Sequence, residues 1–236
     1  GGGAPGAGNV IAGNLGLGLY VGNQSVAGRI QGNLIGLSAD GTSLLGNAWG
    51  GLELSDAGGM LVGTDGDGTA DAAEANWVAA SGGTVVRVAG STATGNVIAG
   101  NWIGTDRTGT AALGGGTGIR LLEGAHDNRI GGLLPVEANR IVGMTTAGIG
   151  LAPDAGLANA LLGNLITGAP IAIDLGEDGP TINDTGDGDS GPNALQNHPV
   201  LTEAVVGDLI SGYLSSTAGA PFRIEVFGSA TPGGLA

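Results

Sequence analysis

The sequence predicts an all-β protein, a solenoid of short parallel strands, and three observations lead to this prediction. Glycine supplies 52 of the 236 residues, and each glycine inside a helix costs about 1 kcal/mol, which argues against long helices. Hydrophobic residues make up 42% of the chain, enough for a core. The heptapeptide GNVIAGN occurs at residues 8–14 and again, unchanged, at residues 95–101. Such self-similarity is typical of stacked repeats that bury one another's apolar side chains.

A short repeating unit predicts the first strand of each coil. It consists of asparagine or a substitute, a variable residue, an aliphatic residue and often Gly-Asn. Because side chains alternate faces along a strand, the aliphatic position points inward and the variable position points to solvent. The inward positions are Ile11, Ile30, Val62, Val78, Ile98, Ile130, Ile141 and Leu162. The outward positions are Val10, Arg29, Leu61, Trp77, Val97, Arg129, Arg140 and Leu161.

A second strand follows, usually opening with glycine. Two or three such strands in about twenty residues describe one coil of a parallel solenoid. The glycine-opened strands are GLYV, GLEL, GIRL and GIGL, beginning at Gly18, Gly51, Gly118 and Gly148. TVVRV (Thr84–Val88) and PIAID (Pro170–Asp174) take the same place. A sandwich or barrel, the alternative, would have longer strands at shorter spacing.

The corners between strands are predicted to carry asparagine. This residue tolerates left-handed backbone, and its amide can hydrogen-bond from coil to coil. Equivalent corners are assigned to Asn14, Asn33, Asn101 and Asn164. The longest internal match pairs residues 27–47 with residues 95–115, an offset of 68 residues. The pattern breaks at NWVAASGG, residues 76–83, where the Gly-Asn corner is lost.

Several of these repeats resemble a known family. GNVIAGN, GNWIGTDRTGTAALG, GIRLLEGAHDNRIGG and ANRIVG are similar to the right-handed parallel β-helix repeats of large secreted or cell-surface bacterial proteins, which share the pectate-lyase-like superhelix. The stretch that begins IDLGEDGPTIND at Ile173 resembles the segment that closes such helices. The resemblance covers about Gly8 to Phe227. It implies a right-handed parallel β-helix and a secreted or cell-surface location, but no particular activity.

The chain divides into three predicted parts. Residues 1–176 form the β-helix, residues 177–198 an acidic Gly/Pro-rich connector, and residues 199–236 a partial β-strand module resembling the start of a sandwich. The module offers ISGYLSS and FRIEVFG as strands, and about three strands alone are marginally stable in water. The chain begins GGGAPGAGN, without methionine or signal peptide. We therefore expect a piece of a larger protein, with both ends covered by further sequence, a neighbouring copy or another chain.

Charge is sparse and acidic, which limits the expected partners. The formal net charge is −14, and all seven basic residues are arginine. Such a surface repels phosphate backbones, so nucleic acid is not an expected partner. No apolar run approaches the roughly 18 residues of a membrane span. Cysteine is absent, which excludes a disulfide framework and thiolate metal sites.

The loop GTDGDGTADAAE, Gly63–Glu74, is the sharpest chemical signal. Laid on the twelve-residue calcium loop, it supplies oxygen ligands at five positions but has glycine at the first, where aspartate is wanted. These ligands would be Asp65, Asp67, the carbonyl of Thr69, Asp71 and Glu74. A second, weaker metal candidate is Asp184, Asp187 and Asp189, where clustered carboxylates repel one another unless a cation or solvent relieves them. For both, a solvated acidic loop is the alternative.

Candidates for catalysis are few. In enzymes that resemble this fold, lyases use calcium-binding acids with an arginine or lysine base, and hydrolases use aspartates on adjacent coils. The best set here is Arg120, Glu123, His126 and Asp127, with Asp106 on the preceding turn. Arg120 lies between two inward residues and is therefore an ordinary outward residue. Three tryptophans could stack on sugars, but they are too widely spaced in the sequence to predict a platform: Trp49, Trp77 and Trp102.

The favoured function is therefore non-catalytic: a structural, adhesion or assembly segment of a secreted or cell-surface protein. The alternatives are a polysaccharide-binding or polysaccharide-degrading β-helix and a self-assembling extracellular fibre subunit. A homo-oligomer or larger extracellular assembly, and a polysaccharide, are the partners considered. Acids and arginines converging on one face over consecutive coils would favour the enzyme.

Overall fold

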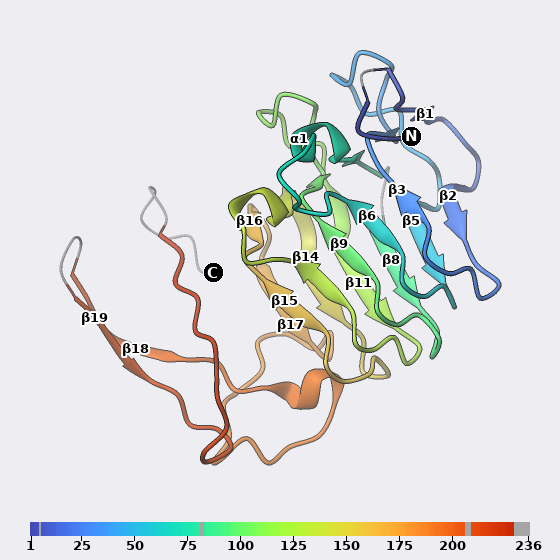
Figure 1. Cartoon of the computed structure of the whole chain (residues 1–236). Helices are drawn as coiled ribbons and strands as arrows, with labels where there is room; N and C mark the ends of the chain where they lie inside the picture. Colours follow the sequence, from blue (N-terminus) through green and yellow to red (C-terminus); the bar gives the residue numbers. More distant parts are fainter. Residues whose placement is uncertain (5, 81–82, 206–208, 229–236) are drawn as a thin grey trace.

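The chain folds into three parallel sheets and a separate hairpin (Figure 1). The computed structural model describes residues 1–4, 6–80, 83–205 and 209–228. Sheet 1 contains β1 (Val10–Ile11), β4 (Leu34–Ile35), β7 (Trp77–Val78), β10 (Trp102–Ile103), β13 (Arg140–Val142) and β16 (Leu165–Thr167). Sheet 2 contains β2 (Leu17–Val21), β5 (Gly50–Ser55), β8 (Thr84–Ala89), β11 (Gly115–Leu122), β14 (Met144–Leu151) and β17 (Ile171–Leu175). Sheet 3 contains β3 (Arg29–Ile30), β6 (Leu61–Gly63), β9 (Val97–Ala99), β12 (Arg129–Gly131) and β15 (Ala160–Leu162).

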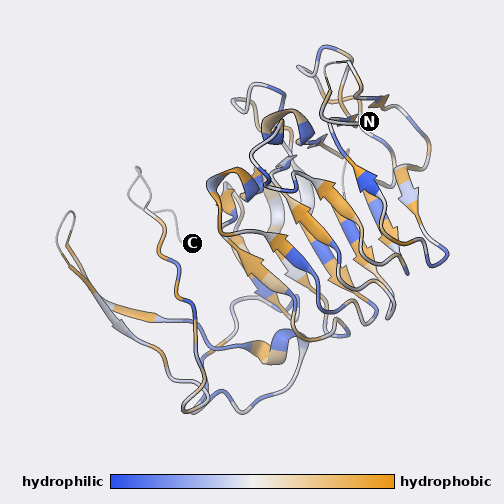
Figure 2. Ribbon diagram, viewed as in Figure 1, coloured by the Kyte–Doolittle hydropathy of each residue, from blue (hydrophilic) through white to orange (hydrophobic). Residues whose placement is uncertain are grey.

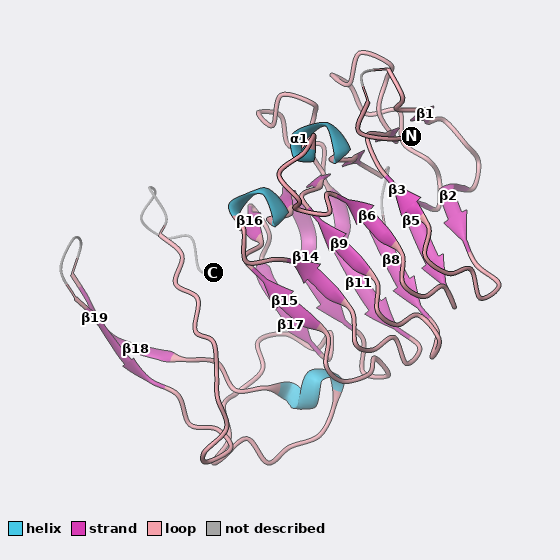
Figure 3. Cartoon of the chain, in the orientation of Figure 1, coloured by secondary structure: helices cyan, strands magenta, loops and turns pink. Residues whose placement is uncertain are grey.

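Successive strands enter the three sheets in strict rotation. Each coil of the chain therefore gives one strand to sheet 1, one to sheet 2 and one to sheet 3, and the next coil pairs with it in parallel. This is an all-β, solenoid-like stack, as the repeats predicted. A single turn of α-helix, α1 (Asp71–Glu74), and a 3₁₀ turn, η1 (Pro135–Glu137), lie in loops between sheets 3 and 1 (Figure 3).

The core lies inside the coils, where aliphatic side chains from all three sheets stack from coil to coil. Figure 2 marks the hydrophobic residues along the strands of the stack in orange. Ile98, Ile130 and Ile141 are fully buried, which confirms the inward positions predicted for them. One position is wrong. Leu161, not Leu162, pairs with Ile130 and packs against the core. The run of two leucines carries no alternation, so the sequence pattern did not distinguish the two faces there.

An asparagine ladder runs along the corner that precedes sheet 1. Each interior asparagine donates its side-chain Nδ2 to Oδ1 of the asparagine one coil further on, at 2.8–3.1 Å. Asn76, Asn101 and Asn139 also donate to a strand carbonyl one coil back, whereas Asn33 donates to the Gln31 carbonyl. We call this ladder 1; its members are Asn9, Asn33, Asn76, Asn101, Asn139 and Asn164. The asparagine corner is therefore kept at residue 76, where the Gly-Asn pattern breaks. Residues 81–82 of that stretch lie outside the described residues.

Asn14 does not belong to ladder 1, contrary to the sequence prediction. Its Nδ2 donates to Oδ1 of Asn47 at 2.8 Å, at the corner between sheets 1 and 2. The prediction failed because the same Gly-Asn motif occurs at more than one corner of a coil. A third set, ladder 2, was not predicted and precedes sheet 3. Its members are Asn96, Asn128, Asn159 and Asn193.

Coil length alternates between short and long. Consecutive members of ladder 1 are separated by 24, 43, 25, 38 and 25 residues, so the expected unit of about twenty residues is too short. The long coils carry hairpin-like insertions after sheet 1, closed by the bridges Leu37↔Leu44 and Thr105↔Ala112. The insertions touch each other, since Arg107 N–H donates to the Gly41 carbonyl at 2.8 Å. The 68-residue sequence offset therefore spans two coils.

Beyond β17 the chain covers the last coil and then leaves the stack. The 3₁₀ turn η2 (Pro192–Leu195) contributes Asn193, whose Oδ1 accepts the backbone N–H of Asn159 at 2.9 Å. β18 (Val200–Ala204) and β19 (Ile210–Tyr213) form an antiparallel pair. Residues 222–227 are extended but belong to no sheet. Residues 206–208 and 229–236, part of the predicted third module, lie outside the described residues.

Candidate functional site

The outer face of sheet 2 carries a row of charged side chains on consecutive coils. The strand register aligns Tyr20, Glu53, Arg87, Arg120, Gly150 and Asp174 across the sheet. Arg87 pairs with Glu53 at 2.5 Å and with Glu123, from the following turn, at 2.7 Å. Acids and arginines thus converge on one face.

Arg120 is held by an acid that the sequence analysis did not connect with it. Its Nε and Nη2 donate to the two carboxylate oxygens of Glu177, which lies 57 residues further along the chain. Glu177 reaches Arg120 across Gly150: a Cβ at Gly150 would lie 3.0 Å from Glu177 Oε1. The hydrogen bond that Arg120 donates to Glu177 raises the pKa of Arg120. A bidentate pair of this kind leaves Arg120 fully protonated, and it is not a proton acceptor in this arrangement.

Asp174 ends the row and is an unusual carboxyl group. It is 6% exposed, and its Oδ1 accepts no hydrogen bond from a described residue. Burial raises its pKa, and the nearby charges of Asp178 and Glu177 act in the same direction. No signal in the sequence marks this residue, because its burial depends on residues 176–181 folding back over the last coil.

The five catalytic candidates do not form one site. His126 and Asp127 contact each other, Nδ1 to Oδ2 at 2.6 Å, on an exposed turn. Glu123 belongs to the Arg87 pair, and Arg120 to the Glu177 pair. No hydrogen bond or ion pair among the described residues joins Asp106 to the other four.

Asp106 instead closes its own insertion. Its carboxylate accepts hydrogen bonds from Thr108 Oγ1 at 2.7 Å and from the backbone N–H groups of Thr110 and Ala111 at 3.0 and 3.1 Å. The hydrogen bond from Thr108 lowers the pKa of Asp106, assisted by the backbone donors. The acid therefore stabilises a turn.

Two aspartate clusters could hold a metal ion. The side chains of Asp65, Asp67 and Asp71 bring carboxylate oxygens within 4.8 Å of one another, on the loop that contains α1. Glu74 is not part of the cluster: it is buried, and its Oε2 accepts the backbone N–H of Asp65 at 3.2 Å. The remaining predicted ligand, Thr69, donates its N–H to Asp67 Oδ1 at 2.7 Å.

Arginine also contacts the first cluster. Arg29 Nη1 lies 2.7 Å from Asp65 Oδ2, and this hydrogen bond lowers the pKa of Asp65. In the second cluster, Asp184, Asp187 and Asp189 are likewise within 4.8 Å. There the buried Asn197 accepts the N–H of Asp184 and donates its own N–H to Asp187, so the cluster also ties the connector together.

A tryptophan pair on the outer face of sheet 1 was missed by the sequence analysis. Trp77 and Trp102 occupy paired positions on β7 and β10, and their rings stack with centroids 6.3 Å apart. The guanidinium of Arg107 lies over Trp77 at 5.3 Å, and that of Arg140 lies over Trp102 at 4.8 Å. The 25 residues between the two asparagines that precede these tryptophans form one short coil, so coil length was the information needed to predict the pair.

Comparisons with protein-family models, curated proteins and solved structures give no match to this chain. Among the described residues, no helix has the length and apolar character needed to cross a membrane. The fold and these sites together define the chain as an all-β, solenoid-like protein of three parallel sheets with two aspartate clusters able to hold a metal ion.

Proposed function

We propose that this chain is a right-handed parallel β-helix segment of a large secreted or cell-surface bacterial protein. Its role is structural: a rigid spacer, adhesion or assembly element. The observation that carries the proposal is ladder 1, which has one member directly before each of the six strands of sheet 1 and no gap among them. Side-chain amides that hydrogen-bond to one another from coil to coil make the scaffold rigid. The same bonds use up the hydrogen-bonding capacity of these amides.

The charged residues support the same role. A catalytic acid, base or nucleophile needs hydrogen-bonding capacity directed at a substrate. Arg87 and Arg120 direct theirs at Glu53, Glu123 and Glu177. Asp106 directs its carboxylate at its own turn. In this geometry the groups hold coils and turns together.

The experiment is a turnover assay combined with a stability measurement. Purified protein is incubated with uronate-containing and neutral polysaccharides, with and without calcium, and new reducing ends and unsaturated products are followed. We expect no turnover, and a lower melting temperature in Arg120→Gln because the Glu177 pair is lost. Turnover that disappears in Arg120→Gln, with the fold retained by circular dichroism, would contradict the proposal.

One observation favours the second candidate, a polysaccharide-binding or polysaccharide-degrading β-helix. Charged residues occupy three consecutive coils of sheet 2, at Glu53, Arg87 and Arg120. After Gly150 the aligned row ends at Asp174, whose raised pKa suits a proton donor. The substitution Asp174→Asn tests whether this row is an active site or part of a scaffold. In an enzyme that uses this carboxyl group the substitution removes turnover, whereas in a scaffold it changes only stability.

We also propose that the Gly63–Glu74 loop binds Ca²⁺. The grouping of Asp65, Asp67 and Asp71 supports it, because Ca²⁺ prefers several carboxylate oxygens in a flexible loop. The Arg29 contact and the inward Glu74 argue that a bound ion would take fewer protein ligands than the five predicted, with solvent completing its shell.

The calcium proposal predicts a chelator effect. Removing free Ca²⁺ should lower the melting temperature, because an ion that binds only the folded state stabilises it by mass action. Asp67→Asn should abolish the difference between chelated and calcium-loaded samples. Asp187→Asn, in the other cluster, is the matched control and should leave the difference intact. Equal melting temperatures with and without chelator would contradict calcium binding and mean that the loop is a solvated insertion.

A further inference from the structure

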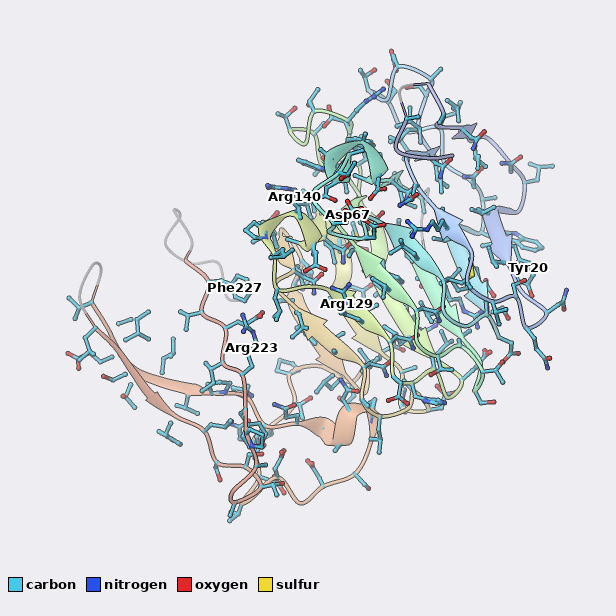
Figure 4. The ribbon with its side chains drawn as sticks, viewed as in Figure 1. Tyr20, Asp67, Arg129, Arg140, Arg223 and Phe227 are labelled. Carbon is cyan, nitrogen blue, oxygen red and sulfur yellow. The ribbon has the colours of Figure 1, made fainter. Side chains whose placement is uncertain are left out.

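Two arginines differ from the other five: Arg140, on β13 of sheet 1, and Arg107, in the insertion that follows β10. Each of the five donates to a carboxylate within 2.9 Å; they are Arg29, Arg87, Arg120, Arg129 and Arg223. The guanidinium groups of Arg107 and Arg140 make no hydrogen bond to any described residue, and both side chains are exposed. Both lie against the Trp77–Trp102 stack. We call these four residues the cation–indole face; Figure 4 labels Arg140 on it.

The indole rings contact the guanidinium groups without using their N–H groups. An arginine stacked on an aromatic ring keeps its fork of donors free, and that fork matches the two oxygens of a carboxylate. Asp40 and Asp106, the acids of the two neighbouring insertions, are engaged in their own turns through Ser38 and Thr108. The face therefore presents preorganised donors that lack acceptors.

The rest of the molecule indicates which carboxylates fit. With a net charge of −14, two copies repel each other over most of their surface. Contact is favourable only where free guanidinium groups meet acids. The connector carries five acids with no basic residue among them: Glu177, Asp178, Asp184, Asp187 and Asp189. Glu177 is held by Arg120, and Asp184 and Asp187 accept hydrogen bonds within their own chain. Among the described residues, Asp178 and Asp189 are the acids of this segment that keep their carboxylates for a neighbouring copy. Asp178 is exposed. A sugar ring is a poorer occupant, because the indole faces that it would stack on are covered by each other and by arginine.

We infer that the cation–indole face binds the acidic segment, residues 177–189, of a second copy of this chain. The inference rests on the proposed role as an assembly element and names the contact through which assembly occurs. Arg107 and Arg140 each take a carboxylate of the neighbouring copy. Because the two surfaces differ, a contact made once between each pair of copies is heterologous and generates an open filament or a closed ring, whereas a pair that makes it twice closes as a two-fold dimer.

The test is sedimentation velocity of the whole chain over a concentration series at low and high salt. Wild-type protein should form dimers or larger species at low salt, and added salt should dissociate them because the contact is ionic. Arg107→Gln with Arg140→Gln should weaken association at least about tenfold, the effect of losing one or two charge-assisted hydrogen bonds. Arg29→Gln with Arg223→Gln has the same net charge and should associate like wild type.

Several outcomes would overturn the inference. They are a monomeric wild type at every concentration, undiminished association of the Arg107/Arg140 variant, and an equal loss in the control variant. A third arm uses polygalacturonate: binding that requires Arg107 and Arg140, without association of copies, would make a glycan the ligand instead. These results are separable from the proposed structural role, which is tested by turnover and melting temperature.

Discussion

Asparagine 101 illustrates how much one residue contributes to this fold. Its Nδ2 donates to Asn139 Oδ1 and to the Val62 carbonyl, and its Oδ1 accepts from the backbone N–H and Nδ2 of Asn76. The residue is 1% exposed. Truncating it leaves donors and acceptors in two neighbouring coils without these partners.

We expect Asn101→Ala to lower the free energy of unfolding by about 2–4 kcal/mol, since unsatisfied buried polar groups cost 1–3 kcal/mol each. Urea denaturation measures the change. Asn14→Ala is the control: Asn14 is exposed and shares one amide pair with Asn47, so its loss should cost less than about 1 kcal/mol. Equal effects of the two substitutions would mean that ladder 1 adds nothing beyond an ordinary amide contact.

Asp174 makes stability depend on pH in a direction opposite to most acids. Burial raises its pKa above the ordinary 3.8, so the folded state binds its proton more tightly than the unfolded state. This contribution to stability is fully present below the ordinary pKa and is lost as pH rises through the folded-state value.

Asp174→Asn removes that dependence, because an amide keeps the neutral form at every pH. We expect the variant to melt at a higher temperature than wild type at neutral pH, and the difference to vanish in acid below the ordinary pKa of 3.8. Differential scanning calorimetry across this range tests it. A variant less stable than wild type at neutral pH would mean that ionised Asp174 is stabilised by its surroundings.

At the scale of the strand, certain glycines are required because the next coil lies in the place of a side chain. Gly131, at the end of β12, has φ +83°, and a Cβ there would lie 2.0 Å from the Leu162 carbonyl oxygen. Gly68 has nearly the same φ, +85°, but nothing lies within 4 Å of its Cβ position. Comparing substitutions at the two positions therefore separates the cost of the backbone conformation from the cost of packing against the next coil.

Gly131→Ala should therefore destabilise the protein by about 2–5 kcal/mol, the sum of the left-handed backbone cost and overpacking. Gly68→Ala should show the backbone cost alone, about 1–2 kcal/mol. Chemical denaturation of both variants gives the comparison. If the two values agree, the coils separate easily enough to accept a methyl group.

The sequence predicted which residues form strands better than it predicted which sheet each strand joins. A period of two identified Ile98, Ile130 and Ile141 as core, because the pleat alone sets that alternation. Assigning a strand to sheet 1 or sheet 3 needs the length of each coil, and the same asparagine motif precedes both. The pair of Arg120 with Glu177 and the stack of Trp77 on Trp102 depend on coil register, so neither was accessible from local pattern.

At the scale of the whole molecule, the stack has a repeat of two coils. Asn33 and Asn101 lie two steps apart on ladder 1, and the strands that follow them, β4 and β10, belong to the same sheet. Removing residues 34–101 joins Asn33 to Trp102 and lets Asn33 take the place of Asn101 against Asn139. The aliphatic core, ladder 1 and all three sheets then continue without a shift in register.

We expect the deletion of residues 34–101 to yield a folded, cooperative protein with a β-type circular dichroism spectrum. Deletion of residues 34–55 removes β4 and β5 but leaves β6 directly after β3, two strands of the same sheet, so it breaks the rotation of strands and should give an unfolded or aggregated chain. Thermal melts and size-exclusion profiles of both proteins decide the matter. An unfolded long deletion would show that the missing coils contribute contacts beyond neighbour-to-neighbour stacking.

The ladders also bear on how this molecule ages. Asparagine deamidates when the backbone nitrogen of the next residue attacks the side-chain carbonyl, which requires a mobile chain. In ladder 1 that nitrogen is occupied: the N–H of Trp102, after Asn101, donates to the Asn76 carbonyl, and Arg140, after Asn139, donates to that of Asn101. The side-chain carbonyls themselves already accept hydrogen bonds from the preceding coil. Chemical decay is thereby directed to asparagines on open turns such as Asn23, which is exposed and outside both ladders, while those that hold the coils together are protected by the bonds they make.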